Sequence, residues 1–289
     1  MTKPILPYLE TMVSYACNLS CLGCTNYSDY DTQGYVPWSQ GKEWIQNWLE
    51  RVNIERFGLI GGEPLLNPDL KNWIYGTREI MPDARLMLVT NGVLFNKHTN
   101  VLDWLLDIGN CVFKVSTHQP NEFYTQTALQ YIFNRVKWEP ITEFGIDRWI
   151  GPNGVRFQCN IGETFAKSFK GDYTSMMPHN SDPNSAIKNC VQKTCPLLYN
   201  GRLYKCSSIA LLNKTLADWK QTAPDWDLYR NYAGIGTDCN DAELDLFIKQ
   251  FGLAEYICRM CPSETDTDSH FYHLNNVQTK IQWIKKNRV

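Results

Sequence analysis

Three cysteines near the start of the chain are the residues whose types and spacing most clearly indicate chemistry. Cys17, Cys21 and Cys24 form a C-x3-C-x2-C array directly after an apolar segment at 8–15. Three thiolates on one loop can bind three irons of a [4Fe–4S] cubane and leave the fourth iron open to a small ligand. A tetrahedral zinc site usually needs a fourth protein ligand, and no nearby histidine supplies one. The array therefore predicts a cluster with one open position, with a structural zinc loop as the alternative.

Glycine-rich and polar turns follow three more predicted strands, each at the strand's carboxyl end. These turns are Gly61-Gly62-Glu63-Pro64 after 56–60, Thr90-Asn91-Gly92 after 85–89, and a turn beginning at Ser116 after 111–115. Glycines let a ligand approach the backbone closely, and unpaired carbonyls accept hydrogen bonds from an ammonium group. These strand-end turns resemble those of the radical S-adenosylmethionine (SAM) superfamily, and the resemblance implies a ligand at Gly61, Gly62, Glu63, Pro64, Asn91 and Ser116. The alternative at each position is an ordinary turn or strand end.

A fifth strand is predicted at 155–161. Because side chains alternate between the two faces of a strand, Arg156 and Asn160 lie on the same face. Both can therefore point toward the ligand expected at the ends of the other strands.

Five cysteines in the second half form another candidate metal site: Cys190, Cys195, Cys206, Cys258 and Cys261. Asn200-Gly201 predicts a two-residue hairpin turn. Pairing about that turn places Cys195 opposite Cys206, with their β-carbons about 4.5–5.5 Å apart. The C-x2-C pair Cys258 and Cys261 can complete the set from a later loop. Four-cysteine ligation alone does not separate zinc from an iron–sulfur cluster.

The elements that must position these residues follow an alternating pattern. In the first half, short apolar runs alternate with helical patterns, which is typical of an α/β fold with a mostly parallel sheet. Helices are predicted from Ser39 to about 52, from Asn67 to about 80, at 101–108 and at 125–137. Residues 165–189 are polar with few apolar repeats. We therefore predict two domains, 1–185 and 186–289.

Composition excludes several classes of protein. The chain has 289 residues and a net charge of −2, which disfavours nucleic acid as the main partner. There is no signal peptide and no apolar run of about 18 residues, so we expect a cytoplasmic protein without a membrane partner. Eleven cysteines in such a chain indicate metal or redox chemistry rather than disulfides. Cys111 and Cys159, in apolar segments, are interpreted as buried inert thiols.

The cysteine array and the Gly61–Pro64 turn together resemble the radical S-adenosylmethionine (SAM) superfamily. That resemblance implies a partial (β/α)6 TIM-like barrel and a [4Fe–4S] cluster on Cys17, Cys21 and Cys24. Its open iron would chelate the amino and carboxylate groups of SAM. The resemblance also implies that carbonyls of the Gly61–Pro64 turn accept hydrogen bonds from the methionine amino group. Gly23 departs from the pattern, because the superfamily usually has an aromatic residue there beside adenine.

The second half resembles the auxiliary-cluster domains called SPASM and twitch. Cys190-x10-Gly201-x4-Cys206, followed by a C-x2-C pair, fits their pattern and favours Cys190, whereas the hairpin argument favours Cys195. The number of cysteines favours the one-cluster twitch form, with a second [4Fe–4S] cluster. Cys239 lies outside the pattern. It is a candidate hydrogen-atom donor, as in some radical SAM epimerases, and the alternative is a packed or surface thiol.

The resemblance implies reductive cleavage of SAM to a 5′-deoxyadenosyl radical, with an electron from a donor such as flavodoxin or ferredoxin. The radical would abstract hydrogen from a small-molecule substrate and lead to its oxidation or rearrangement, as in dehydrogenases of aminoglycoside biosynthesis. Two alternatives remain: epimerisation or crosslinking of a peptide, and a non-catalytic zinc-binding protein. The chain begins at the first strand, without room for a leader-binding domain, and this favours the small molecule.

Overall fold

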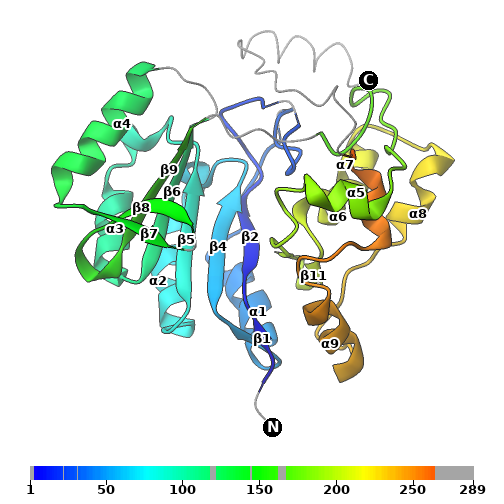
Figure 1. The fold of residues 1–289 in the computed structure, drawn as a ribbon, viewed down its shortest axis with the longest axis horizontal. Helices are drawn as coiled ribbons and strands as arrows, with labels where there is room; N and C mark the ends of the chain where they lie inside the picture. Colours follow the sequence, from blue (N-terminus) through cyan, green and yellow to red (C-terminus); the bar gives the residue numbers. More distant parts are fainter. Residues whose placement is uncertain are drawn as a thin grey trace. The chain divides into compact units, whose positions relative to one another are not determined.

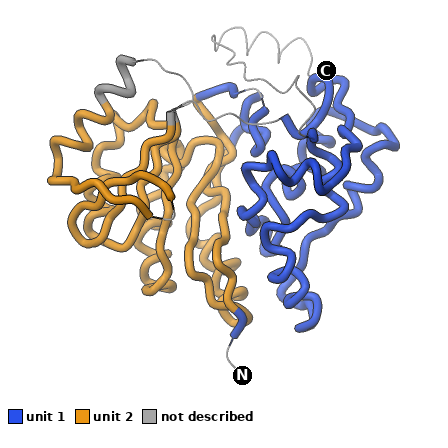
Figure 2. The backbone as a smooth tube through the Cα atoms, in the orientation of Figure 1, with its two compact units in different colours: residues 1–4, 19–33, 164–289 blue, residues 5–18, 34–163 orange. Residues whose placement is uncertain are grey.

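The structure is a computed structural model that describes residues 3–21, 23–30, 32–117, 122–143, 145–161 and 167–263. The chain divides into two compact units (Figure 2). Residues 5–18 and 34–163 form one, here called the sheet unit. Residues 1–4, 19–33 and 164–289 form the other, here called the cysteine unit. Within the described ranges, no helix is both long and apolar enough to cross a membrane.

The sheet unit contains a mixed β-sheet with strand order β2-β4-β5-β6-β9-β8-β7 (Figure 1). Its parallel strands are β2 (Leu9–Ser14), β4 (Arg56–Gly61), β5 (Arg85–Thr90), β6 (Cys111–Thr117) and β9 (Arg156–Ile161). The antiparallel strands β7 (Glu139–Glu143) and β8 (Ile146–Ile150) form a hairpin that pairs with β9. A short parallel ladder joins β1 (Ile5–Leu6) to β3 (Asn53–Ile54). The predicted α/β class is confirmed.

Four helices connect these strands: α1 (Trp38–Leu49), α2 (Leu70–Ile80), α3 (Asn100–Ile108) and α4 (Glu122–Arg135). The core between helices and sheet is aromatic, and Trp48, Trp73 and Phe57 are completely buried in it. Short 3-10 turns lie at η1 (Pro64–Leu66), η2 (Phe95–Lys97) and η3 (Pro152–Gly154). The arrangement leaves the carboxyl ends of the parallel strands at one edge of the sheet.

The first two helices begin at other residues than predicted. The first helix begins at Trp38, so Ser39 lies inside its first turn, and the Trp38 backbone N–H donates to Asp69 Oδ2 at 2.6 Å. The second helix begins at Leu70 rather than near Asn67. The Asn67 side chain donates instead to the Val13 carbonyl at 2.7 Å. This buried hydrogen bond ties the loop before the helix to β2.

The cysteine unit is built of short elements around the hairpin of β10 (Leu197–Tyr199) and β11 (Arg202–Tyr204). The hairpin register is as predicted, with Leu197 opposite Tyr204. Asn200 and Gly201 both have positive φ, 49° and 74°, as a type I′ turn requires. The helical elements are α5 (Pro183–Lys188), α6 (Ser207–Ala210), α7 (Leu212–Asp218), η4 (Pro224–Trp226), α8 (Asp227–Arg230), α9 (Asp241–Lys249) and η5 (Tyr256–Met260).

The contacts divide the chain earlier than the predicted boundary after residue 185. Residues from 164 onward join the cysteine unit, and so does the loop 19–33. An aromatic cluster explains this grouping, since Tyr173 packs on Tyr30 with ring centroids 4.3 Å apart and on Trp219 at 5.0 Å.

Candidate active site

The Gly61-Gly62 turn runs directly against the end of β2. The Gly62 N–H donates to the Ser14 carbonyl at 2.8 Å, and the Glu63 N–H donates to the Ala16 carbonyl at 2.8 Å. A β-carbon on Gly62 would lie 2.3 Å from the Ala16 oxygen. Only glycine fits this approach, so the turn is fixed against the residue that precedes Cys17.

Glu63 connects this turn to the end of the neighbouring strand β5. Its carboxylate is completely buried and accepts hydrogen bonds from Leu65 N at 3.0 Å, Thr90 Oγ1 at 2.6 Å and Asn91 N at 2.8 Å. Burial raises the pKa of Glu63 to about 7, although the three donors act in the opposite direction. In this structure Glu63 organises two strand ends.

Asn91 combines a local turn with a contact to the cysteine array. Its Oδ1 accepts from Val93 N at 2.9 Å, which closes an Asx turn. Its Nδ2 donates to Asn18 Oδ1 at 2.8 Å and lies 3.9 Å from Cys17 Sγ. Asn91 can therefore form an ordinary turn and also contact the cysteine array, so the two interpretations of Thr90-Asn91-Gly92 do not exclude each other.

The polar side chains of β6 and β9 differ in their hydrogen-bond partners. Ser116 is buried at the end of β6, and its Oγ has no hydrogen-bond partner among the described residues. Asn160 Oδ1, near the end of β9, accepts from Gln158 Nε2 at 2.8 Å. Arg156 lies near the opposite end of β9, where its Nε donates to Glu143 Oε2 at 2.7 Å. A buried hydroxyl without a partner is uncommon in a folded protein, so Ser116 is suited to contact a ligand.

The boundary between the two units falls inside the cysteine array, after Asn18. Cys17 belongs to the sheet unit, whereas Cys21 and Cys24 belong to the cysteine unit. Two turns shape the loop, in which Cys24 N donates to the Cys21 carbonyl at 3.2 Å and Tyr27 N to the Cys24 carbonyl at 3.1 Å.

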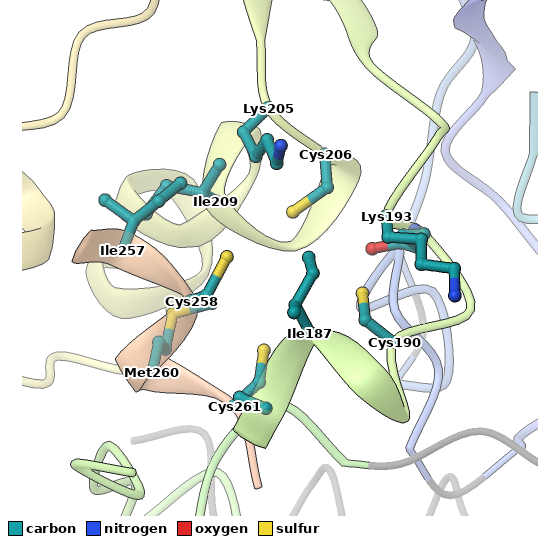
Figure 3. Close-up of a pocket in the computed structure, with 12 residues that line it drawn as sticks. Ile187, Cys190, Lys193, Lys205, Cys206, Ile209, Ile257, Cys258, Met260 and Cys261 are labelled. Atoms are coloured by element: carbon teal, nitrogen blue, oxygen red, sulfur yellow. The ribbon is translucent and has the colours of Figure 1, made fainter. Parts of the chain in front are cut away.

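Four cysteines line one pocket in the cysteine unit, and Figure 3 shows their sulfur atoms facing a common space. They are Cys190 after α5, Cys206 at the N-cap of α6, Cys258 within η5 and Cys261 at its C-cap. The pocket holds about 390 Å³ of space not filled by atoms, part of it open to solvent. Apolar side chains such as Ile209, Ile257 and Met260 complete its wall.

Burial and mutual repulsion disfavour the charged forms of these thiols. Burial raises the pKa of Cys206 to about 12, with a further contribution from Cys190, and raises the pKa of Cys261 well above its usual value. The pKa values of Cys190 and Cys258 are raised by burial as well. Four partly buried thiols in one pocket are therefore neutral unless a cationic group compensates their thiolates.

Lys205 is a buried cation at this pocket that the sequence analysis did not identify. Its ammonium group donates to the carbonyls of Gln250 at 2.9 Å and Leu253 at 2.7 Å, and lies 3.2 Å from Glu255 Oε1. These three acceptors match its three protons. A lysine directly before Cys206, at the end of an apolar strand, was the available signal.

Cys195 and Cys239 are not among the residues that line the pocket. The hairpin ladder ends at Leu197 and Tyr204, before it reaches Cys195, whose N–H donates to the Gln192 carbonyl at 3.0 Å. Cys239 N donates to the Gly236 carbonyl at 3.1 Å. Within the described residues, no three His, Cys, Asp or Glu side chains are arranged to hold a single metal ion.

Curated relatives match part of this chain. The GTP 3′,8-cyclase of Nautilia profundicola is 26% identical over 100 residues, which cover 34% of this chain and 31% of the relative. The GTP 3′,8-cyclase of Helicobacter pylori is 26% identical over 96 residues, 32% of this chain and 30% of the relative. The chain thus spans about a third of the length of these relatives.

A solved structure and a family model match as well. The crystal structure of BtrN in complex with AdoMet and 2-DOIA aligns with 94% of this chain and 100% of its own, with a TM-score of 0.50 and 16% identity. This likeness shows a shared fold. Residues 11–143 match the model of the radical SAM superfamily. The chain is therefore similar to the radical SAM superfamily over the segment that holds the cysteine array and the Gly61–Pro64 turn.

Proposed function

We propose that this protein is a radical SAM enzyme, which cleaves SAM reductively at a [4Fe–4S] cluster bound by Cys17, Cys21 and Cys24 and then abstracts hydrogen from a small molecule. The observation that carries the proposal is the cysteine array, whose first member Cys17 directly follows the Ala16 carbonyl that accepts from Glu63 N, within the segment that matches the superfamily model. When bound, the cluster and SAM supply a 5′-deoxyadenosyl radical. The protein supplies the ligands, the orientation of SAM and the exclusion of water.

The residues at the carboxyl edge of the sheet suit SAM. In the Gly61–Pro64 turn, the Glu63 and Pro64 carbonyls already accept from Leu66 N and Asn67 N, so the Gly62 carbonyl is the candidate acceptor for the methionine ammonium group. The Glu63 side chain holds that turn in place. Ser116 Oγ is a buried hydroxyl that can bind the SAM carboxylate or ribose. Asn160 is a further candidate contact. The likeness to BtrN supports a partial (β/α)6 barrel for this part of the chain.

A second [4Fe–4S] cluster, bound by Cys190, Cys206, Cys258 and Cys261, is the second part of the proposal. A zinc ion holds its cysteine sulfurs about 2.3 Å from the metal. The four cysteines instead line one pocket, and no described group of three is arranged for a single ion. That geometry favours a cluster over zinc and supports a twitch-type domain. Cys195 is then the spare cysteine.

Two clusters favour a net two-electron oxidation of the substrate. Abstraction of one hydrogen atom leaves a substrate radical, and the substrate then loses one more electron and one proton to give the product. A second cluster held by Cys190, Cys206, Cys258 and Cys261 would supply an acceptor for that electron, and a donor such as flavodoxin or ferredoxin would supply the electron that SAM cleavage consumes. BtrN was crystallised with AdoMet and 2-DOIA, which supports a small molecule over a peptide.

Iron analysis after anaerobic reconstitution tests the proposal. We expect about eight irons per chain and formation of 5′-deoxyadenosine from SAM on reduction. Replacement of Cys17, Cys21 and Cys24 by alanine should remove about half of the iron and all 5′-deoxyadenosine formation. Full iron content in that triple variant, or zinc in place of iron, would contradict the assignment. Turnover of peptides but not of small molecules would overturn the substrate class.

A further inference from the structure

Two buried serines next to a proposed cluster ligand bind the loop that carries the other cluster's cysteines. Ser207 and Ser208, at the start of α6, each donate from Oγ to the Thr25 carbonyl at 3.1 Å. Ser207 is completely buried and Ser208 is 2% exposed. All three residues belong to the cysteine unit, and Thr25 directly follows Cys24.

Gln192 connects the two serines to each other. Its Nε2 donates to Ser207 Oγ, and Ser208 Oγ lies 3.2 Å from its Oε1. A serine hydroxyl carries one proton, so Ser208 shares that proton between Gln192 Oε1 and the Thr25 carbonyl. Gln192, Ser207, Ser208 and the Thr25 carbonyl are called the Ser–Gln network below. Its polar groups satisfy one another in a site almost closed to water.

The residues of the Ser–Gln network lie within two positions, in sequence, of proposed cluster ligands. Thr25 follows Cys24, Ser207 follows Cys206, and Gln192 lies two residues after Cys190 and lines the same pocket. A shift of Cys206 or Cys190 therefore reaches the backbone next to Cys24 through buried hydrogen bonds. Such a buried, mutually satisfied network transmits displacement better than exposed side chains do.

We propose that Gln192, Ser207 and Ser208 are positioning residues that couple the SAM-binding cluster to the auxiliary cluster. This inference rests on the two-cluster function proposed above. The auxiliary cluster fixes Cys206 and Cys190, the Ser–Gln network fixes Thr25, and the loop then holds Cys24 in the geometry that binds SAM. Loss of the auxiliary cluster therefore weakens SAM binding even where the first cluster is retained.

Separate contacts hold the later part of the same loop. Tyr27 Oη lies 3.0 Å from Ser168 Oγ, and Tyr173 Oη donates to Asp29 Oδ1 at 2.5 Å. Removal of the two serine hydroxyls should therefore loosen residues 23–26 without detaching the whole loop.

SAM titration of the reduced holoenzyme, followed by the electron paramagnetic resonance signal of the first cluster, tests the coupling. We expect the Ser207→Ala/Ser208→Ala variant to keep about eight irons but to bind SAM about tenfold more weakly. Hydrogen exchange of the holoenzyme should be faster at residues 23–26. Thr215→Val removes another buried hydroxyl of this unit, one that donates within α7, and should change SAM affinity less than about twofold. Ser208→Thr, which retains a hydroxyl, should bind SAM like the wild type.

A double-mutant cycle separates coupling from a merely structural role. Cys258→Ala/Cys261→Ala removes the auxiliary cluster and should weaken SAM binding about tenfold in the wild-type background. In the Ser207→Ala/Ser208→Ala background, the same pair of cysteine substitutions should weaken SAM binding by less than about a further twofold. Independent, multiplicative effects, or unchanged SAM affinity in both serine variants, would overturn the inference. A wild-type holoenzyme without a SAM-dependent signal would instead refute the proposed function itself.

If the double serine variant fails to fold, the single variant Ser208→Ala tests the coupling in its place. It keeps the hydrogen bonds of Ser207 and should weaken SAM binding about threefold, with the iron content unchanged. Loss of iron from both clusters without a change in SAM affinity for the remaining loaded fraction would count against the coupling.

Discussion

Glu63 shows how one buried carboxylate can organise two neighbouring strand ends. Its two oxygens receive three donors, from the turn after β4 and from the end of β5. Asn91, one of these donors, also reaches Asn18 and Cys17. The glutamate of the Gly61–Pro64 turn is thus connected to the first thiol of the cysteine array through a single residue.

Glu63→Gln should lower the free energy of unfolding by about 1–3 kcal/mol. A protonated carboxyl group keeps a lone pair on each oxygen, whereas the amide nitrogen of glutamine has none to offer the Asn91 N–H. Chemical denaturation of both proteins at pH 5 measures the loss. Equal stability there would contradict the role given to this side chain.

The same pair of proteins should differ in pH dependence. Because burial raises the folded-state pKa of Glu63 from 4.5 to about 7, its contribution to stability is fully present below pH 4.5 and is lost as pH rises through 7. The stability difference between wild type and Glu63→Gln should therefore shrink between pH 5 and pH 8.

At the scale of elements, the β7–β8 hairpin is joined to the sheet by a charged cluster around Glu143. This carboxylate on β7 pairs with Arg156 on β9 at 2.7 Å, with Arg148 on β8 at 3.0 Å and with Arg85 on β5 at 3.5 Å. The Glu143 side chain is 22% exposed, so the cluster is only partly screened by solvent. Removal of the carboxylate charge leaves three guanidinium groups facing one another.

Glu143→Gln should destabilise the protein by about 1–3 kcal/mol, between the values of exposed and buried ion pairs. Hydrogen bonding to Arg156 lowers the pKa of Glu143, so its contribution is present above pH 4.5 and is lost as pH falls through the depressed value. Urea unfolding at pH 7 and at pH 3 measures both effects. Asp147→Asn on β8, which lies outside the arginine cluster, is the control and should change stability by less than about 0.5 kcal/mol.

At the scale of the whole chain, the four-cysteine pocket is assembled from three separate segments. Cys190 follows α5, Cys206 precedes α6, and the C-x2-C pair comes more than 50 residues later, in and after η5. A metal group bound there closes long loops, so its binding free energy contributes to folding. The cysteine unit should therefore be markedly less stable without it.

Cys190→Ala should lose about four irons and lower the melting temperature, because it removes one of four proposed ligands and the group that cross-links the unit. Cys195→Ala is the matched control and should keep about eight irons. Iron analysis and thermal unfolding of both variants check this. Iron loss in the Cys195 variant, with retention in the Cys190 variant, would reverse the assignment.

Local patterns in the sequence were sufficient for several features of this protein. The cysteine array, the Gly61–Pro64 turn and the register about Asn200-Gly201 each lie within a few consecutive residues, so residue type and spacing predict them. The alternation of strands and helices predicted the α/β class. The β7–β8 hairpin was not predicted, because its strands are short and one contains Pro140 near the sheet edge.

The sequence by itself determined the C-x3-C-x2-C array and the identity of five candidate cysteines for a second site. The tertiary structure decided that Cys190 rather than Cys195 lines the pocket, and that the loop 19–33 joins the cysteine unit. It also decided the partners of Glu63 and of Ser207. These features depend on contacts between segments far apart in the chain, where burial and hydrogen bonding select partners that no local spacing encodes.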